Sequence, residues 1–102
     1  MESVIEKNRQ AIAELCRRHH VARLDVFGSL VAGDFNESSD IDFLVEFDTD
    51  VNRRRFDNFF ELLRAMERLF NRRVDLVEAG GLRNPYFIKR VNETRKPIYA
   101  AS

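Results

Sequence analysis

The chain has 102 residues, of which 44% are hydrophobic and nine are Phe, enough for one packed core and too apolar for a disordered chain. Its 17 basic and 17 acidic residues balance, so it lacks the basic excess that bulk nucleic-acid binding needs. A single cysteine, Cys16, excludes an internal disulfide and a cysteine metal cluster. No segment resembles a signal peptide or a membrane span. We therefore expect one cytoplasmic domain over residues 1–102, with no direct contact to membranes or nucleic acids.

The first half of the chain predicts one helix and two strands. Apolar residues recur at helical spacing from Ser3 to about His20, at Ile5, Ile12, Leu15, Cys16 and His19. Apolar and charged residues alternate over residues 22–27, which predicts a strand that ends at Gly28. A short helical turn at 29–32 and a polar loop at 34–39 lead to a second strand at 40–47.

The second half predicts two more helices and two more strands. A wide apolar stripe over residues 53–70 predicts a helix whose Phe residues form core, with some of them free to meet a partner. A strand at 72–79, a helix from Pro85 to about Asn92 and an edge strand at 97–100 follow. This alternation predicts an α/β fold in which helices flank a small sheet, mixed or parallel.

Acidic residues interrupt two of the predicted strands. Asp40 and Asp42 are two residues apart and so share one face of their strand. Asp75 interrupts the strand at 72–79, and it joins them if the two strands are neighbours. Adjacent carboxylates repel one another unless a cation lies between them, and Mg²⁺ prefers such oxygen ligands. Any one of these residues alone is more often a solvent-exposed strand residue. Together they predict a site for two metal ions about 3.5–4 Å apart, suited to phosphoryl transfer.

A glycine and a serine precede this acidic pair. Gly28 ends a strand and Ser29 opens a turn of helix, where backbone N–H groups are free to bind an anion. Glycine lets a phosphate approach closely, and the Ser29 hydroxyl adds a donor. Taken alone, the pair is more simply an ordinary strand-to-helix turn. Beside the carboxylates, it predicts a phosphate site.

The combination resembles a known signature. Gly28-Ser29, ten residues and then Asp40-Ile41-Asp42 is similar to the Gly-Ser-x10-Asp-x-Asp motif of the DNA polymerase β-like nucleotidyltransferase superfamily. "SDIDFLVEF" and "RRVDLVEAGGLRNPYFIKRV" resemble more specifically its minimal nucleotidyltransferase (MNT, MntA-like) family, over residues 21–99. The resemblance implies a polymerase β-like fold in a single minimal nucleotidyltransferase domain over residues 1–102. It also implies nucleotide phosphates at Gly28 and Ser29, and metal ions at Asp40, Asp42 and Asp75.

The resemblance further implies a reaction and a partner. Many members of the family are antitoxins of type VII toxin–antitoxin systems, encoded beside a HEPN-domain RNase toxin. Characterised members transfer AMP from ATP to a tyrosine of that toxin. For this chain the resemblance implies two Mg²⁺ ions, ATP as substrate and a HEPN-domain toxin as partner. Asp40 and Asp42 then bridge the metals, and Asp75 holds the catalytic metal and accepts the proton of the acceptor hydroxyl.

One position departs from the family pattern. Members carry Arg in "GS-x-x-R-G", whereas this chain has Ala32 in "GSLVAG". The departure predicts weaker nucleotide binding or a substitute cation, for which Lys89 is a candidate. It leaves open a second function, a catalytically weak antitoxin or binding module that neutralises its partner by occlusion. Transfer to tRNA or an aminoglycoside is a third reading, disfavoured because the chain has no added domain to hold such a substrate.

Overall fold

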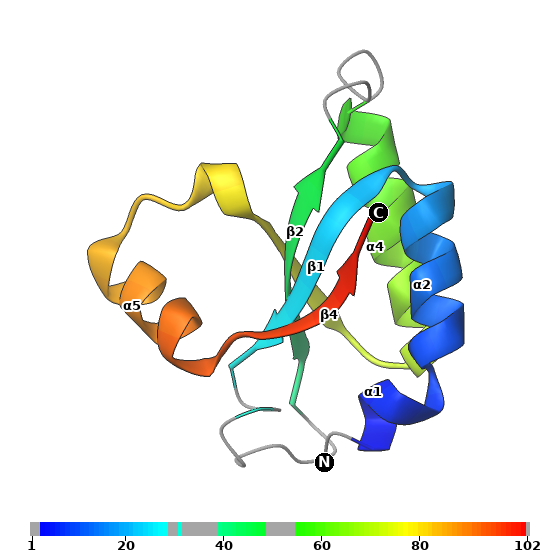
Figure 1. Ribbon diagram of the computed structural model, residues 1–102, viewed down its shortest axis with the longest axis horizontal. Helices are drawn as coiled ribbons and strands as arrows, with labels where there is room; N and C mark the ends of the chain where they lie inside the picture. Colours follow the sequence, from blue (N-terminus) through cyan, green and yellow to red (C-terminus); the bar gives the residue numbers. More distant parts are fainter. Residues whose placement is uncertain (1–2, 29–30, 32–38, 49–54, 102) are drawn as a thin grey trace.

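The structure is a computed structural model that describes residues 3–28, 31, 39–48 and 55–101. Within these ranges two helices precede the first two strands, and helices and strands alternate from α4 onward (Figure 1). In chain order the elements are α1 (Ser3–Lys7), α2 (Arg9–Arg18), β1 (Val21–Phe27), β2 (Ile41–Phe47), α4 (Arg55–Phe70), β3 (Val74–Glu78), the 3-10 helix η2 (Ala79–Gly81), α5 (Pro85–Thr94) and β4 (Lys96–Ala100). The predicted turn at 29–32 and loop at 34–39 fall almost entirely outside the described residues.

The four strands form one mixed sheet in the order β3-β2-β1-β4. β1 runs antiparallel to both β2 and β4, whereas β2 and β3 are parallel. Parallel neighbours need a long connection between them, and α4 is part of that connection. The predicted α/β fold, in which helices flank a small mixed β-sheet, is therefore confirmed. In this sheet β3 lies beside β2, and β4 lies at an edge.

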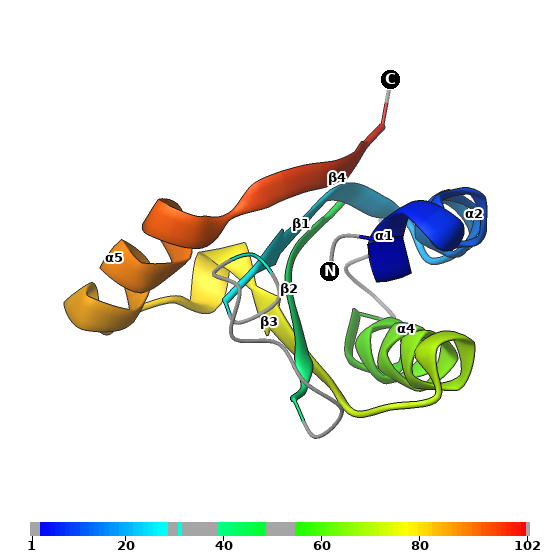
Figure 2. The same ribbon diagram turned by 90° about the horizontal axis from the view of Figure 1, so that it is seen from below.

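Three helices cover one face of this sheet. Figure 2 shows the sheet nearly edge-on, with α1, α2 and α4 on one side and α5 on the other. The alternate residues of β1 and β2 that face the three helices include Leu24, Val26, Phe43 and Val45, all buried. They pack against apolar residues of the helices to form the main core, with Ile5, Ile12, Cys16, Leu62 and Met66. Cys16 is a core residue, as its place in the periodic pattern predicted.

The opposite face carries a smaller apolar cluster under α5. It consists of Phe27, Leu44 and Val91, with Phe87 packed against it. The Phe27 and Phe87 rings meet edge to face, with centroids 5.9 Å apart at 83°. Because strand side chains alternate between faces, the face that carries Phe27 and Leu44 also carries the polar residues of β1 and β2.

The first predicted helix is in fact two helices. The helix is interrupted at Asn8, between α1 and α2. The Asn8 side chain donates to the Val4 carbonyl over 2.8 Å, and its backbone N–H donates to the Ile5 carbonyl. An asparagine that bonds to nearby backbone in this way competes with the helical pattern, and this explains the break.

The predicted Phe stripe of α4 is only partly core. Phe56 is 75% exposed, whereas Leu62 and Met66 are fully buried. At 3.6 residues per turn, Phe56 and Phe60 lie on a flank of the helix well away from Leu62 and Met66. Their rings contact each other in a tilted arrangement, with centroids 4.9 Å apart at 58°. The stripe therefore forms core only in part, and Phe56 is one of its residues that is free to meet a partner.

Candidate active site

Two of the predicted acidic residues are direct neighbours in the sheet. Asp42 of β2 lies opposite Asp75 of β3 in the parallel register. Asp42 also lies opposite Phe27 of β1, and Phe27 immediately precedes Gly28. Asp42 is half-buried and Asp75 is exposed. The parallel pairing thus brings together two carboxylates that are 33 positions apart in the sequence (42 and 75).

The third acidic residue lies just outside the strand. Asp40 precedes β2, which begins at Ile41, and its side chain is exposed. The strand predicted at 40–47 therefore begins one residue later than expected, and Asp40 lies immediately before it. The backbone of Asp40 is still held near β3, because Arg72 donates to the Ser39 carbonyl over 2.8 Å and the Ile41 N–H donates to the Arg73 carbonyl over 3.1 Å.

The charges of Asp75 and Asp40 are close enough to perturb Asp42. The pKa of Asp42 is raised from 3.8 to about 6. Burial is the main cause, followed by the negative charges of Asp75 and then Asp40, and the positive charge of Arg90 acts in the opposite direction. A nearby cation stabilises the charged form of a half-buried carboxylate that lies close to other negative charges. The oxygens of Asp42 and Asp75 therefore favour the binding of a metal ion.

The carboxylates do not close around a single point. Over residues 3–28, 31, 39–48 and 55–101, no three His, Cys, Asp or Glu side chains converge as they would in a metal site complete in itself. Magnesium is commonly bound through only one or two carboxylates, together with water and substrate phosphates. The arrangement of Asp42 and Asp75 fits that mode of binding and does not fit a closed structural metal site.

Gly28 lies against this carboxylate pair. Its φ is +78°, in the region that glycine adopts without strain. A Cβ at this position would overlap Oδ2 of Asp42. The Gly28 N–H donates to Oγ1 of Thr94 over 3.0 Å. Gly28 makes room for Asp42, its role beside a phosphate stays a prediction, and Ser29 lies outside the described residues.

Helix α5 is fixed beside the site by two further contacts. Thr94 Oγ1, which accepts from Gly28, itself donates to the Arg90 carbonyl over 2.9 Å. Arg95, the residue that follows α5, donates from Nε to Oδ2 of Asp25 over 2.8 Å. Asp25 lies in the middle of β1 and its side chain is only 2% exposed. The helix is therefore tied to β1 at two consecutive residues.

Sequence reasoning missed this second layer of the site. It identified Asp40, Asp42, Asp75 and Gly28, but not the residues that hold α5 in place. A charged residue inside the apolar strand 22–27 was a signal that pointed to Asp25. Its partner Arg95 lies 70 residues later, in a segment without any pattern of its own.

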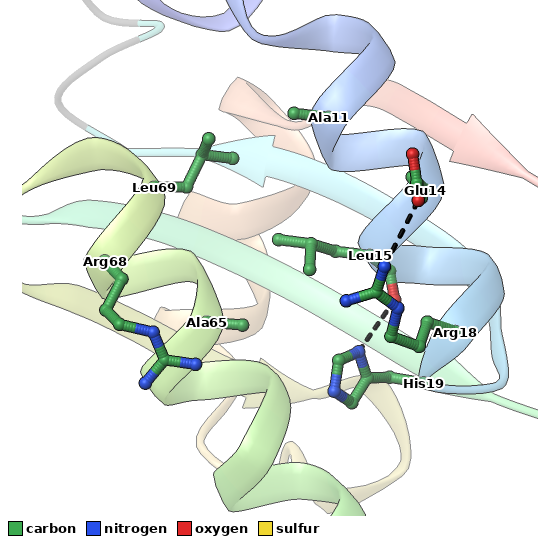
Figure 3. A pocket seen from close by; sticks show the side chains of 8 residues that line it. All are labelled: Ala11, Glu14, Leu15, Arg18, His19, Ala65, Arg68 and Leu69. Atoms are coloured by element: carbon green, nitrogen blue, oxygen red, sulfur yellow. Dashed lines mark hydrogen bonds and ion pairs between the residues drawn. The ribbon is translucent and has the colours of Figure 1, made fainter.

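A separate groove lies on the far side of the sheet, between α2 and α4. It has a volume of about 500 Å³ and is lined by Ala11, Glu14, Leu15, Arg18, His19, Ala65, Arg68 and Leu69 (Figure 3). Arg18 pairs with Glu14 at 3.2 Å, and Nδ1 of His19 donates to the Leu15 carbonyl over 2.9 Å. These contacts are local to α2, and the groove includes none of the acidic residues discussed above.

None of the helices in the described part of the chain combines the length and the apolar character required to cross a membrane.

The fold and the carboxylate pair define a class of enzyme. A mixed sheet that places neighbouring aspartates beside a glycine turn is the arrangement of a nucleotidyltransferase, and a family model described as a nucleotidyltransferase domain matches residues 8–98. Protein adenylyltransferase MntA of Thermococcus cleftensis is 36% identical over 84 residues, which cover 82% of this chain and 79% of that protein. A proposed protein adenylyltransferase of Methanocaldococcus jannaschii is 30% identical over 93 residues, 91% of this chain and 89% of that protein.

Solved structures agree with these sequence matches. The structure of a proposed minimal nucleotidyltransferase has a TM-score of 0.76 at 35% identity and covers 93% of each chain. A complex of tri-AMPylated Shewanella oneidensis HEPN toxin with its MNT antitoxin has a TM-score of 0.63 at 20% identity, over 94% of this chain and 72% of that chain, which shows a shared fold. The chain belongs to the minimal nucleotidyltransferases of the polymerase β-like superfamily, as its motifs indicated.

Proposed function

We propose that the protein transfers AMP from ATP to a tyrosine hydroxyl of a HEPN-type toxin and thereby acts as a type VII antitoxin. The observation that carries the proposal is the Asp42–Asp75 pair in parallel register, with the pKa of Asp42 raised to about 6 beside Gly28. Membership of the nucleotidyltransferase family supports the reaction type. The relatives named as protein adenylyltransferases support a protein hydroxyl as the acceptor.

Asp42 and Asp75, with Asp40 at the mouth of the site, are the residues that would hold Mg²⁺, as two ions. When bound, the ions would supply positive charge to the phosphates and to the attacking and leaving oxygens. Oxygen is the only donor type the three residues offer, and hard cations such as Mg²⁺ prefer it. The raised pKa of Asp42 fits this role, because a nearby cation relieves the repulsion that raises it.

The chain's own residues position the reacting groups. The tyrosine oxygen forms a bond to the α-phosphorus of ATP as the bond from that phosphorus to the departing pyrophosphate breaks. Asp75 is exposed and opposite Asp42, and both observations support Asp75 as the acceptor of the proton that the tyrosine hydroxyl would lose. Gly28 lets the Asp42 carboxylate lie against the turn, where a side chain would displace it.

Intact-mass spectrometry of the partner tests the proposal. A HEPN-type partner protein, incubated with this chain, ATP and Mg²⁺, should gain mass in units of AMP and stay inactive after this chain is removed. Asp75→Asn should abolish the mass gain and still bind the partner. Asp48→Asn, which removes an exposed carboxylate at the other end of β2, is the matched control and should transfer normally. No mass gain even at high enzyme concentration would contradict the proposal.

A second function is neutralisation by occlusion. The observation in its favour is Phe56, a large apolar side chain that is 75% exposed and packed against Phe60. Under this mechanism inhibition requires stoichiometric protein, does not depend on ATP and survives Asp75→Asn. Phe56→Ser would then abolish inhibition, whereas under the transferase mechanism it weakens docking and leaves transfer intact at high protein concentration.

A further inference from the structure

Helix α5 carries a cation beside the turn that holds Asp42. Arg90 lies about one helical turn before Thr94, whose hydroxyl accepts from the Gly28 N–H, and Gly28 lies against Asp42. In agreement with this position, the charge of Arg90 lowers the pKa of Asp42, whereas burial and the other two aspartates raise it. The backbone of the same residue is fixed as well, because its carbonyl accepts from Thr94 Oγ1, which in turn accepts from the Gly28 N–H. One hydroxyl therefore sets the position of residue 90 relative to the Gly28 turn.

The geometry of α5 separates Arg90 from its basic neighbour. Phe87, Val91 and Thr94 lie on the helix face that meets the sheet, through contacts to Phe27 and Gly28. At 3.6 residues per turn, Arg90 lies at the border of this face, whereas Lys89 lies on the opposite side of the helix. The sequence suggested Lys89 as the substitute cation, and the helix geometry favours Arg90.

We propose that Arg90 binds the phosphates of the metal-bound nucleotide and supplies the positive charge that Ala32 lacks. The inference rests on the proposed function, since it names a phosphate-binding residue of the same site. Arg90 is exposed to solvent and so can reach a ligand. A guanidinium offers planar, paired N–H donors that match phosphate oxygens.

The electrostatics of the site favour such a residue. A cluster of carboxylates attracts a metal ion but repels the phosphates that accompany it. A fixed cation beside the cluster repels the metal ion and attracts the phosphates. Loss of Arg90 should therefore weaken the binding of metal with phosphate but not the binding of metal alone, which no purely structural role predicts.

Titration calorimetry with Mg²⁺ alone and with Mg²⁺ plus inorganic tripolyphosphate tests this assignment. Arg90→Gln should weaken tripolyphosphate binding about tenfold to a hundredfold, as expected for the loss of charge-assisted hydrogen bonds. Binding of Mg²⁺ alone should be unchanged or tighter, and the Tm should be unchanged. Arg90→Lys should recover part of the loss, because charge returns without the paired geometry. Lys89→Gln removes the same charge from the other side of the helix and should stay within about threefold of wild type.

The outcomes separate this inference from the proposed function. Equal tripolyphosphate affinity in Arg90→Gln and wild type overturns the role of Arg90, even if wild type modifies its partner. A parallel loss of both affinities, a fall in Tm, or no tripolyphosphate binding by wild type overturns it too. If tripolyphosphate binding depends on Arg90 but wild type transfers no AMP to its partner, the role of Arg90 stands and the proposed function fails.

Discussion

Oδ2 of Asp42 occupies the space that a side chain at position 28 would fill, so the two residues can be neighbours only because residue 28 is glycine. The contact links the turn after β1 to the centre of the carboxylate pair. It gives Gly28 a role in shaping the site that does not depend on direct contact with a phosphate.

Gly28→Ala should destabilise the protein by about 2 kcal/mol or more, since a left-handed φ strains an alanine and its Cβ collides with Asp42. The same variant should lose affinity for Mg²⁺ because the carboxylate is displaced. Urea denaturation and metal titration measure the two effects. Gly80→Ala is the matched control, since a Cβ there meets nothing within 4 Å, and it should change stability by less than about 0.5 kcal/mol. Equal effects of the two substitutions would show that the close approach to Asp42 is not limiting.

Asp42→Asn should stabilise the metal-free protein at neutral pH. The pKa of Asp42 is raised from 3.8 to about 6, so the folded state binds its proton more tightly than the unfolded state does. The contribution of this group to stability is therefore greatest below about pH 4 and is lost as the pH rises through about 6. The Tm advantage of Asp42→Asn in EDTA should grow over that interval and then level off. Added Mg²⁺ should raise the Tm of wild type alone and so reverse the order. An advantage that is constant with pH would argue against crowded carboxylates.

The ion pair between Asp25 and Arg95 should be costly to break. Arg95→Ala leaves a carboxylate that is 2% exposed without its main partner, and we expect a loss of about 3 kcal/mol in the free energy of unfolding. Arg23→Ala is the control, because that residue is 52% exposed and approaches Asp25 only to 3.6 Å. Its loss should cost about 1 kcal/mol or less, because the Arg23 guanidinium is half exposed and makes no hydrogen bond to Asp25. Chemical denaturation of both variants provides the comparison, and similar losses would mean that α5 is not held by Arg95.

Cys16 should be inert in the native protein. Its side chain is fully buried, and burial raises the pKa of the thiol to about 12. At about pH 8 almost no thiolate forms, and thiolate is the reactive species. Ellman's reagent should label the protein only after unfolding in guanidinium. Rapid labelling without denaturant would show that α2 separates readily from the sheet.

A site residue could be predicted from the sequence where the residues around it follow a regular apolar pattern that the site residue interrupts. Asp42 and Asp75 each interrupt an apolar strand, so their strands, and the face they share, follow from periodicity. Phe56 fitted an apolar stripe but lies on its flank, because a wide stripe of Phe residues does not specify which of its sides meets the sheet. Arg90, Thr94 and Arg95 could not be predicted, since their partners lie 48 to 70 positions earlier in the chain (42 to 90 and 25 to 95) and no local repeat reports such contacts.

The hydrogen bond between Gly28 and Thr94 spans 66 residues and has a consequence for the timing of folding. β1 and β2 are made before β3, α5 and β4, and β4 pairs with the inner strand β1. A nascent chain that lacks residues 94–100 has neither the anchor of α5 nor the edge strand that covers β1, so the site cannot assemble before these residues leave the ribosome. The chain should therefore acquire activity in one step once residues 94–100 are available. Truncations before Thr94 should lose Mg²⁺-dependent thermal stabilisation completely, and a gradual loss with length would contradict this dependence.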